Sequence, residues 1–356
     1  MTETRIENLR EKIENNQAVL ITSDVNRLYF SGFKSSAGAV VITKKNAYLL
    51  VDFRYFENAK KSVKNLKVIM YTSYYNTLKE IFESENIKEI YCETDFITVE
   101  GLKTLKKQLP DYRVLEENEI CRYIKNMRSV KSEFELESIK KAQAITDKTF
   151  SHILDFISTE RTEKEIALEM EFFMRKNGSE GIAFDTIVVS GKNSSLPHGV
   201  PTDKKIDKGD FITMDFGAVV NGYCSDMTRT VAVGFVSVKQ REVYETVLKA
   251  QTEALKAIKP SAECKEIDKI ARDIIDNAGF ENCFGHGLGH SVGLEIHESP
   301  CFNTRDNTKL QNGMILTVEP GIYIENEFGV RIEDMVNITE DGYENLTAST
   351  KELIII

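Results

Sequence analysis

Short apolar runs alternate with helical periods through residues 1–125. Four runs rich in β-branched and aromatic residues predict strands; they are the segments AGAVVIT, AYLLVDF, LKVIMY and IKEIYCE. Four stretches with apolar residues at helical spacing predict helices, and these cover residues 3–15, 54–64, 75–86 and 98–108. This alternation is typical of an α/β domain. No glycine-rich phosphate motif follows any of these strands, so the domain predicts no nucleotide site.

Longer segments with the periodicity of amphipathic helices follow this domain. Residues 132–157 predict one long helix, with Ser132 as its N-cap. Residues 162–178 predict a second helix, which opens on a capping box of Thr162 and Glu165.

A second domain, residues 130–356, repeats one order of elements. After the two helices comes a β-hairpin over residues 210–234 that turns at Asn221-Gly222. Two more predicted helices (238–258 and 264–277) and another hairpin (314–339) follow. The order helix–helix–hairpin thus occurs twice at an offset of about 105 residues, which predicts two similar halves across a pseudo-twofold axis with hairpins that share a sheet.

Composition narrows the classes of function. The chain has 356 residues, 29 % of them charged, which suits a globular protein of two domains. Its net charge of −10 gives no sign of the basic surface that nucleic-acid binding requires. We expect a cytoplasmic protein without a membrane partner, since neither a signal-peptide core nor an apolar run of about 18 residues stands out. The six cysteines form no C-x-x-C pair, which favours free thiols.

Carboxylates interrupt the apolar strands of the first hairpin. With a two-residue turn, Val220 pairs with Tyr223, and Asp226 then faces Gly217. Asp215 is the diagonal neighbour of Asp226 on the same face, roughly 7–8 Å away, so that two side chains can converge on one ion. A buried carboxylate needs a partner, and a metal ion is one.

The second hairpin repeats this arrangement. Glu319 and Glu333 lie on its two arms, and Arg331 points to the same face as Glu333 because strand side chains alternate. Taken singly, each carboxylate is more often a solvated strand residue. Four of them in two matched hairpins predict a metal centre.

Residues 285–300, GHGLGHSVGLEIHESP, hold three of the five histidines, His286, His290 and His297. The spacing of the first two would suggest a zinc pair on a helix, but the glycines disfavour a helix and no H-E-x-x-H motif is present. We therefore expect extended backbone that points both imidazoles in similar directions. His290 is the candidate imidazole that completes a dinuclear site.

These motifs resemble those of the Xaa-Pro peptidases, prolidase and aminopeptidase P, which have the pita-bread fold. The matching segments are MDFGAVVNGYCSDMTRT, GHGLGH, HESP, TVEPGIYI and VRIED, while SDVNRLYFSGF and VDFRYFENA resemble the N-terminal domain of that family. The resemblance covers nearly the whole chain. It implies a creatinase/prolidase-like α/β domain followed by an α+β pita-bread catalytic domain of the creatinase/aminopeptidase type.

The resemblance also implies roles for individual residues. Two divalent ions would be held by five side chains, with Asp226 and Glu333 touching both ions; the five are Asp215, Asp226, His290, Glu319 and Glu333. His198, in LPHGVP, and His297 would contact the reacting centre. His286 would line the substrate pocket, and Tyr323 and Arg331 would support the ligands or the substrate.

This ligand set fits hydrolysis of a peptide bond before proline. Four carboxylates and one imidazole are mostly hard ligands, which suit Mn²⁺, with Co²⁺ and Zn²⁺ as alternatives. The two ions would acidify a water and polarise the scissile carbonyl. Glu319 would pass the proton of that water to the leaving proline nitrogen, which carries no N–H in the substrate. His198 and His297 would stabilise the oxyanion.

Substrate length stays open at this point. Many prolidases carry an arginine shortly after the HE pair, whereas this chain has Cys301 there, and Arg305 is an alternative anchor. A dipeptidase and an aminopeptidase, both acting on small peptides with proline second, are therefore both kept, and the resemblance implies a homodimer.

Two rival functions share the fold. One is a methionyl or broader aminopeptidase, against which the domain of residues 1–125 argues. The other is a non-enzymatic peptide-binding module, which would lack metal ligands that are all present here.

Overall fold

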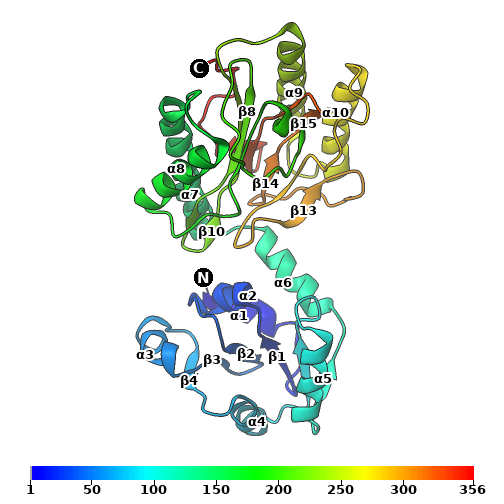
Figure 1. The fold of residues 1–356 in the computed structure, drawn as a ribbon. Helices are drawn as coiled ribbons and strands as arrows, with labels where there is room; N and C mark the ends of the chain where they lie inside the picture. The colour runs from blue at the N-terminus through cyan, green and yellow to red at the C-terminus, as the bar shows by residue number, and fades with distance from the viewer. Residues whose placement is uncertain (1) are drawn as a thin grey trace. The chain divides into compact units, whose positions relative to one another are not determined.

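The computed structural model describes residues 2–356, which fall into two compact units (Figure 1). Unit 1 ends at Met127, and unit 2 covers Arg128–Ile356. No helix in residues 2–356 combines the length and the apolar character that crossing a membrane requires.

Unit 1 is a six-stranded mixed sheet covered by helices. Its strands are β1 (Gln17–Ile21), β2 (Ala39–Thr43), β3 (Ala47–Val51), β4 (Lys67–Met70), β5 (Glu89–Cys92) and β6 (Arg113–Leu115). Its helices are α1 (Thr2–Arg10), α2 (Asp24–Ser31), α3 (Phe53–Ser62), α4 (Tyr74–Ser84), α5 (Val99–Gln108) and α6 (Glu119–Ser129), the last of which runs into unit 2. The strand order is β4–β3–β2–β1–β5–β6, with β1 antiparallel to β2 and parallel to β5.

The predicted α/β pattern of unit 1 is confirmed, but four of its elements were not predicted. The strand β1 lies inside the sheet with four of its five residues buried, so it shows no polar alternation. The strand β6 has only three residues, and α2 has only eight. The helix α6 was missed although its apolar residues are helically spaced.

Unit 2 contains four long helices in two pairs. They are α7 (Glu133–Phe156) with α8 (Glu163–Lys176), and α9 (Val238–Ala257) with α10 (Cys264–Asn277). All four were predicted from periodicity. Both predicted caps are present, since Ser132 and Thr162 each form a capping box with the glutamate three residues later.

Each half of unit 2 ends in bent β-strands. The first half has β7 (Ile187–Ser190), the short 3₁₀ helix η1 (Gly191–Ser195), β8 (Phe211–Phe216), β9 (Val219–Val220), β10 (Tyr223–Cys224) and β11 (Met227–Ala232). The second half has β12 (Gly289–Ser291), β13 (Glu298–Phe302), β14 (Ile315–Val318), β15 (Gly321–Ile324), β16 (Phe328–Arg331), β17 (Asp334–Ile338) and β18 (Tyr343–Asn345).

The first hairpin has the predicted register. Asn221 and Gly222 have φ of 53° and 80°, the left-handed values of a two-residue type I′ turn. Val220 consequently pairs with Tyr223.

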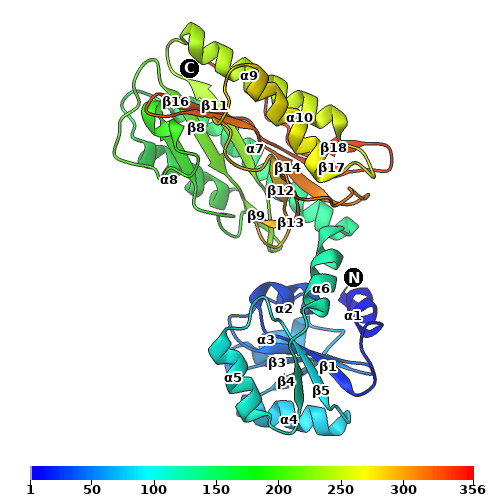
Figure 2. The ribbon, with the colours of Figure 1, turned by 90° about the vertical axis from the view of Figure 1, so that its right-hand side faces the viewer.

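The two halves of unit 2 have separate apolar cores. Ile153, Met170 and Met214 belong to the core between α7, α8 and the first hairpin. Val247 and Leu316 belong to the core beneath α9 and α10, which lie side by side in Figure 2. The helix–helix–hairpin order is therefore present twice, as predicted. The prediction that the hairpins share one sheet is wrong: β7, β8 and β11 form a three-stranded sheet, and β12, β13, β14, β17 and β18 form a separate five-stranded sheet. The two sheets meet through bonds such as that from the Glu333 N–H to the Thr228 carbonyl oxygen (3.1 Å), and the strands there carry the polar residues described next.

Candidate metal centre

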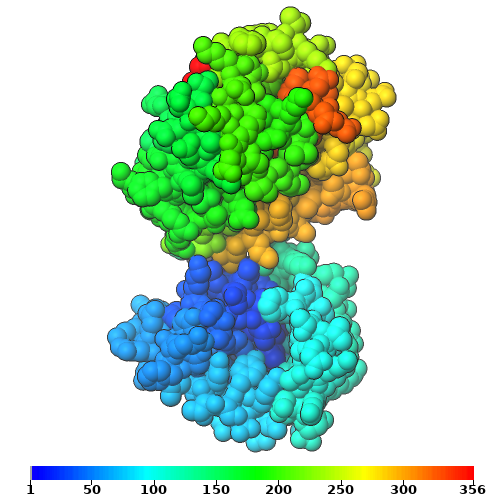
Figure 3. Space-filling model, viewed as in Figure 1, coloured from blue at the N-terminus to red at the C-terminus, as the bar shows by residue number. Residues whose placement is uncertain are grey.

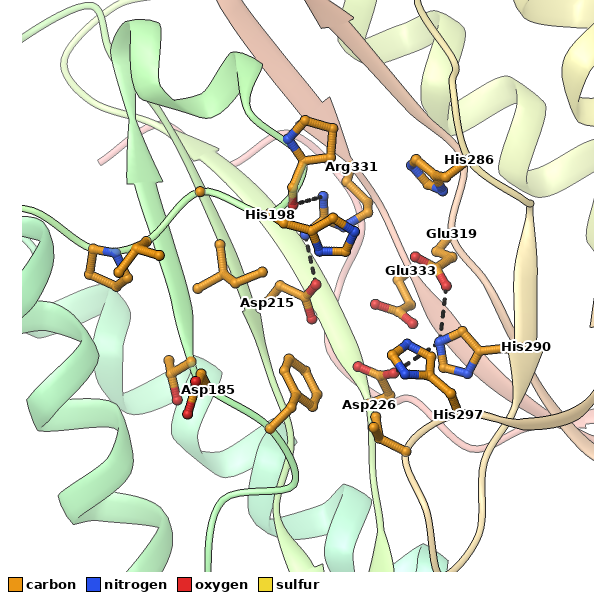
Figure 4. A pocket seen from close by; sticks show the side chains of 18 of the residues that line it. Asp185, His198, Asp215, Asp226, His286, His290, His297, Glu319, Arg331 and Glu333 are labelled. Atoms are coloured by element: carbon orange, nitrogen blue, oxygen red, sulfur yellow. Dashed lines mark hydrogen bonds and ion pairs between the residues drawn. The ribbon is translucent and has the colours of Figure 1, made fainter. Parts of the chain in front are cut away.

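Four carboxylates from the two hairpins converge inside unit 2 (Figure 4). Asp215 lies on β8, and Asp226 lies just before β11. Glu319 directly follows β14 and Glu333 directly precedes β17, and the two face each other because Val318 pairs with Asp334. One oxygen each from Asp215, Asp226 and Glu333 lies within 4.8 Å of the others. The structure thus brings together the four carboxylates that the hairpin patterns predict.

The imidazole of His290 points into this cluster. Its Nε2 lies 3.3 Å from Glu319 Oε1 and 3.6 Å from Asp226 Oδ2. Its Nδ1 lies 3.2 Å from the Ser291 carbonyl oxygen, which only a protonated Nδ1 can approach as a donor. Without an ion, a protonated Nε2 faces Glu319; loss of that proton would leave the Nε2 lone pair for an ion.

Two carboxylate oxygens in the cluster lack a donor. Asp215 Oδ1 and Glu333 Oε1 are buried and have no hydrogen-bond partner within residues 2–356. The other oxygen of each carboxylate is bonded: Arg331 Nη2 donates to Asp215 Oδ2 at 2.7 Å, and Thr228 Oγ1 donates to Glu333 Oε2 at 2.7 Å. A buried carboxylate oxygen without a donor is costly unless a cation lies beside it. The cluster of four carboxylates and one imidazole, in which two carboxylate oxygens lack a donor, therefore fits hard divalent cations.

Burial and mutual repulsion set the acidities of the cluster. Burial, and then the negative charges nearby, raise the pKa of Asp226 and Glu333 well above their usual range. Burial also raises the pKa of Asp215, against the opposing charge of Arg331. For Glu319 burial acts upward too, but the hydrogen bond and charge of His290 outweigh it and lower the pKa to about 2. A cation among these groups would remove the repulsion.

A hydrogen-bonded chain joins the three predicted substrate-side residues to the cluster. His286 Nε2 lies 2.9 Å from the Tyr323 hydroxyl, to which Arg331 Nη1 donates at 2.9 Å. Arg331 also binds Asp215, and its Nε donates to the Thr228 hydroxyl at 3.0 Å. The position of Arg331 is therefore fixed from three sides, and it holds one oxygen of Asp215.

The remaining predicted histidines lie at the rim of the cluster. The ring of His297 lies 4.4 Å from that of His290, centroid to centroid, at an angle of 65°. His198 is exposed and lies in front of Arg331 in Figure 4. Burial lowers the pKa of both His286 and His297, which favours neutral imidazoles at pH 7.

Comparison with known proteins identifies the family. Residues 137–340 match Metallopeptidase family M24, and residues 5–130 match the Creatinase/Prolidase N-terminal domain. The chain belongs to metallopeptidase family M24. Its fold is a creatinase-type N-terminal domain followed by the pita-bread catalytic domain, as predicted. Members of this family are peptide hydrolases that use divalent metal ions.

Several relatives match this chain over nearly its whole length. An Xaa-Pro dipeptidase from Pyrococcus furiosus is 40% identical over 98% of this chain and 99% of its own. The solved structure of an Xaa-Pro dipeptidase from Bacillus anthracis is 40% identical, with a TM-score of 0.96 and full coverage of both chains. An X-Pro aminopeptidase from Thermotoga maritima is 37% identical, with a TM-score of 0.90 over 98% of this chain and 99% of its own.

The carboxylate cluster opens into a cavity of about 880 Å³. Its apolar wall comes from α8, the segment after it and the loop before β13, through Leu168, Phe184, Ile187, Val200 and Ile296. Figure 3 shows the green segment near residue 190 and the orange segment near residue 300 adjoining on one face of unit 2. This wall could not be predicted from the sequence, because its residues lie far apart in the chain and look like ordinary core residues.

Glycine is required at one position of the loop that carries His286 and His290. A Cβ on Gly289 would lie 2.0 Å from the Thr317 carbonyl oxygen, so only glycine lets β12 approach β14. Residues 285–288 are not helical, and the imidazoles of His286 and His290 both turn toward the cluster, as predicted (Figure 4). Thr228 was not predicted, although its place two residues after Asp226 puts it on the same face.

Proposed function

We propose that this M24 enzyme hydrolyses the bond before proline in dipeptides or short peptides whose second residue is proline. Two divalent ions would be held by five side chains, namely Asp215, Asp226, His290, Glu319 and Glu333. The observation that carries the proposal is the pair of buried carboxylate oxygens without donors inside a cluster that His290 completes. The names of the dipeptidase and aminopeptidase relatives support proline at the second position.

When bound, two divalent ions acidify a water molecule and polarise a carbonyl. The donor set is hard, which favours Mn²⁺, with Co²⁺ and Zn²⁺ as alternatives. By the resemblance of the motifs, Asp226 and Glu333 would each ligate both ions, and both side chains are almost fully buried. In the metal-free protein they are also the two carboxyls whose pKa is raised most clearly.

Glu319 is the proposed proton carrier. Glu319 lies in the cluster beside His290, and a carboxylate there can accept a proton at one of its oxygens. The leaving proline nitrogen must gain a proton, because it carries none in the peptide bond. Glu319 would deliver that proton as the bond breaks.

The histidines at the rim would stabilise the negative oxygen that forms on the scissile carbonyl. A neutral imidazole carries one N–H, and the lowered pKa of His297 favours that form. His198 lines the same cavity. One such donor contributes a rate factor of about 10²–10³ in comparable sites.

The cavity suits a small peptide with an apolar second residue. About 880 Å³ lies within the usual range for small-molecule sites, and most of its wall is apolar. His286, Tyr323 and Arg331 would orient the substrate or the ligands through their hydrogen-bonded chain. Cys301 also lines the cavity, whereas Arg305 is exposed. Dipeptides and longer peptides therefore both remain in the proposal, and a homodimer in the cytoplasm remains an expectation.

A panel of peptides tests the function. Chelated enzyme, with and without added Mn²⁺, would be given Leu-Pro, Ala-Pro, Ala-Pro-Ala, Ala-Ala and Met-Ala-Ala. We expect metal-dependent cleavage of the peptides with proline second. Cleavage of Ala-Pro-Ala would extend the activity to an aminopeptidase. Cleavage of Met-Ala-Ala alone would replace the proposal with a methionyl aminopeptidase, and no cleavage by metal-loaded protein would favour a binding module.

A further inference from the structure

A buried carboxylate outside the metal cluster ties together the two ends of the loop that carries His198. Glu163 is the first residue of α8, and its exposed fraction is 0%. The loop leaves β7 at Ser190, passes through η1 and His198, and returns past Glu163 at Thr202. None of the steps proposed above uses Glu163.

Both carboxylate oxygens of Glu163 accept hydrogen bonds from residues of this loop. At one end, Oε1 accepts the Ser190 backbone N–H at 2.6 Å and the Ser190 hydroxyl at 2.8 Å. At the other end, Oε2 accepts the Thr202 backbone N–H at 2.9 Å and the Thr202 hydroxyl at 2.6 Å. The side-chain amide of Asn193 donates to both oxygens, at 3.1 and 3.2 Å. One carboxylate thus closes the loop.

The position of the His198 imidazole depends on this loop. The imidazole is exposed, and within residues 2–356 it makes no hydrogen bond that would orient it. The nearest tie is the preceding residue, because Arg331 Nη1 donates to the Pro197 carbonyl oxygen at 3.3 Å. The backbone of residues 190–202 must therefore hold His198 in place.

We propose that Glu163 is a positioning residue for His198, because it fixes both ends of the loop that presents this imidazole to the cavity. This inference rests on the proposed function, in which His198 contacts the reacting carbonyl. Glu163 itself touches neither the cluster nor the cavity; its neighbour Lys164 lines the cavity wall.

The substitution Glu163→Gln tests this with almost no change in volume. Five polar groups donate six hydrogen bonds to the carboxylate, so the amide nitrogen of glutamine would meet a backbone N–H at one end of the loop. One end would lose its side-chain tie while the other kept it; the bond from the Lys164 N–H to the Thr202 carbonyl oxygen (3.2 Å) and the pairing of Ser190 with Ile212 would remain. Glu165→Gln is the matched control, since Glu165 lies two residues later on α8, caps that helix through Thr162 and touches no residue of the loop.

The test measures kcat and KM for Leu-Pro in a double-mutant cycle of Glu163→Gln with His198→Ala. We expect Glu163→Gln to lower kcat by about 10-fold or more, since a displacement near 1 Å can cost about 10²-fold, with KM changed by less than about two-fold. In the His198→Ala background, Glu163→Gln should lower kcat by less than about two-fold. Glu165→Gln should behave like wild type in kcat.

Hydrogen exchange of backbone amides gives a readout that does not depend on the substrate. Peptides spanning residues 190–202 should exchange faster in Glu163→Gln than in wild type, and other peptides of unit 2 should not. Equal losses of kcat in the wild-type and His198→Ala backgrounds would overturn the proposal, as would unchanged kcat in Glu163→Gln. Failure of the proposed function is distinct, because it would show as wild-type enzyme that does not cleave Leu-Pro at all.

Discussion

In both Asp215 and Glu333, one carboxylate oxygen accepts a hydrogen bond from the protein and the other faces the cluster without a donor. Arg331 holds the bonded oxygen of Asp215, and Thr228 holds that of Glu333. Each carboxylate is thereby oriented before any ion is present. At the residue scale, the proposed centre combines five candidate ligands with a small set of donors that orient them.

The first prediction concerns the ligand Asp215. Asp215→Asn removes one negative charge and one hard oxygen donor, so we expect loss of one bound ion and a fall in activity of at least about 10²-fold. The far-ultraviolet circular dichroism spectrum should be unchanged. Metal content after Mn²⁺ reconstitution, measured with Asp207→Asn as an exposed control, checks this. Full metal content with full activity in Asp215→Asn would remove Asp215 from the ligand set.

The second prediction concerns Thr228, which donates to Glu333 and accepts from Arg331. Thr228→Val keeps the shape and removes the hydroxyl, so we expect Mn²⁺ affinity to fall by about 10–100-fold, as is typical when a ligand loses its orienting partner. Calorimetric titration measures this. Thr213→Val is the control, because Thr213 is equally buried on β8 but its hydroxyl reaches only Thr230 and the Gly329 carbonyl. Equal affinities in the two variants would contradict the role of Thr228.

The ligand residues could be predicted from the sequence because register and alternation are local. The turn at Asn221-Gly222 fixes which residues of the first hairpin face each other, and that places Asp226 beside Asp215. Phe184 could not be predicted as part of the cavity. Nothing near it in the sequence shows that a segment after α8 faces a loop that is more than 100 residues away.

At the scale of elements, close backbone contacts set the position of His290. The strand β12 lies against β14 with no room for a side chain at Gly289. Separation of the two strands would carry His290 away from Glu319, which lies directly after β14. Gly289 therefore helps to position His290, although it would ligate nothing itself.

The third prediction follows from that contact. Gly289→Ala forces β12 and β14 apart, so we expect a loss of about 1–3 kcal/mol in the free energy of unfolding together with weaker Mn²⁺ binding. Gly285→Ala is the control, since an added Cβ there meets nothing within 4 Å. Urea unfolding and metal titration of both variants check the result. If Gly289→Ala matched Gly285→Ala in both measurements, the close contact would not position His290.

Helices of unit 2 were easier to predict than strands of unit 1. The helices α7 and α8 combine long amphipathic periods with capping boxes, and both signals lie within a few residues. The strand β1 is a short, nearly all-apolar run inside a sheet, and such a run carries no period that separates strand from helix. What fixes β1 is pairing with β2 and β5, which are distant in the sequence.

At the scale of the whole molecule, the centre couples metal binding to stability. In the metal-free protein, the raised pKa values of Asp226 and Glu333 mean that the folded chain keeps protons that the unfolded chain releases above the ordinary values of 3.8 and 4.5. The stability from these groups is therefore present below those values and is lost as pH rises through the raised ones. Bound ions would replace the protons and so remove this loss.

The fourth prediction is a pH-dependent difference in Tm. At saturating Mn²⁺, the gap in Tm between loaded and chelated enzyme should widen as pH rises above about 5, since the chelated form loses stability once pH passes the ordinary carboxyl values. Differential scanning calorimetry of both forms measures the gap. A gap that stays constant or narrows with rising pH would show that these carboxyls are not protonated in the metal-free protein.

The central claim is that two ions, held by five side chains, make this chain a peptidase for bonds before proline. The most direct test adds Mn²⁺ stepwise to chelated enzyme and measures both the ions bound per chain and the release of proline from Leu-Pro. We predict no release without metal and a plateau at two ions per chain. Proline release that is the same in chelated and reconstituted enzyme, or no release with two ions bound, would contradict the claim.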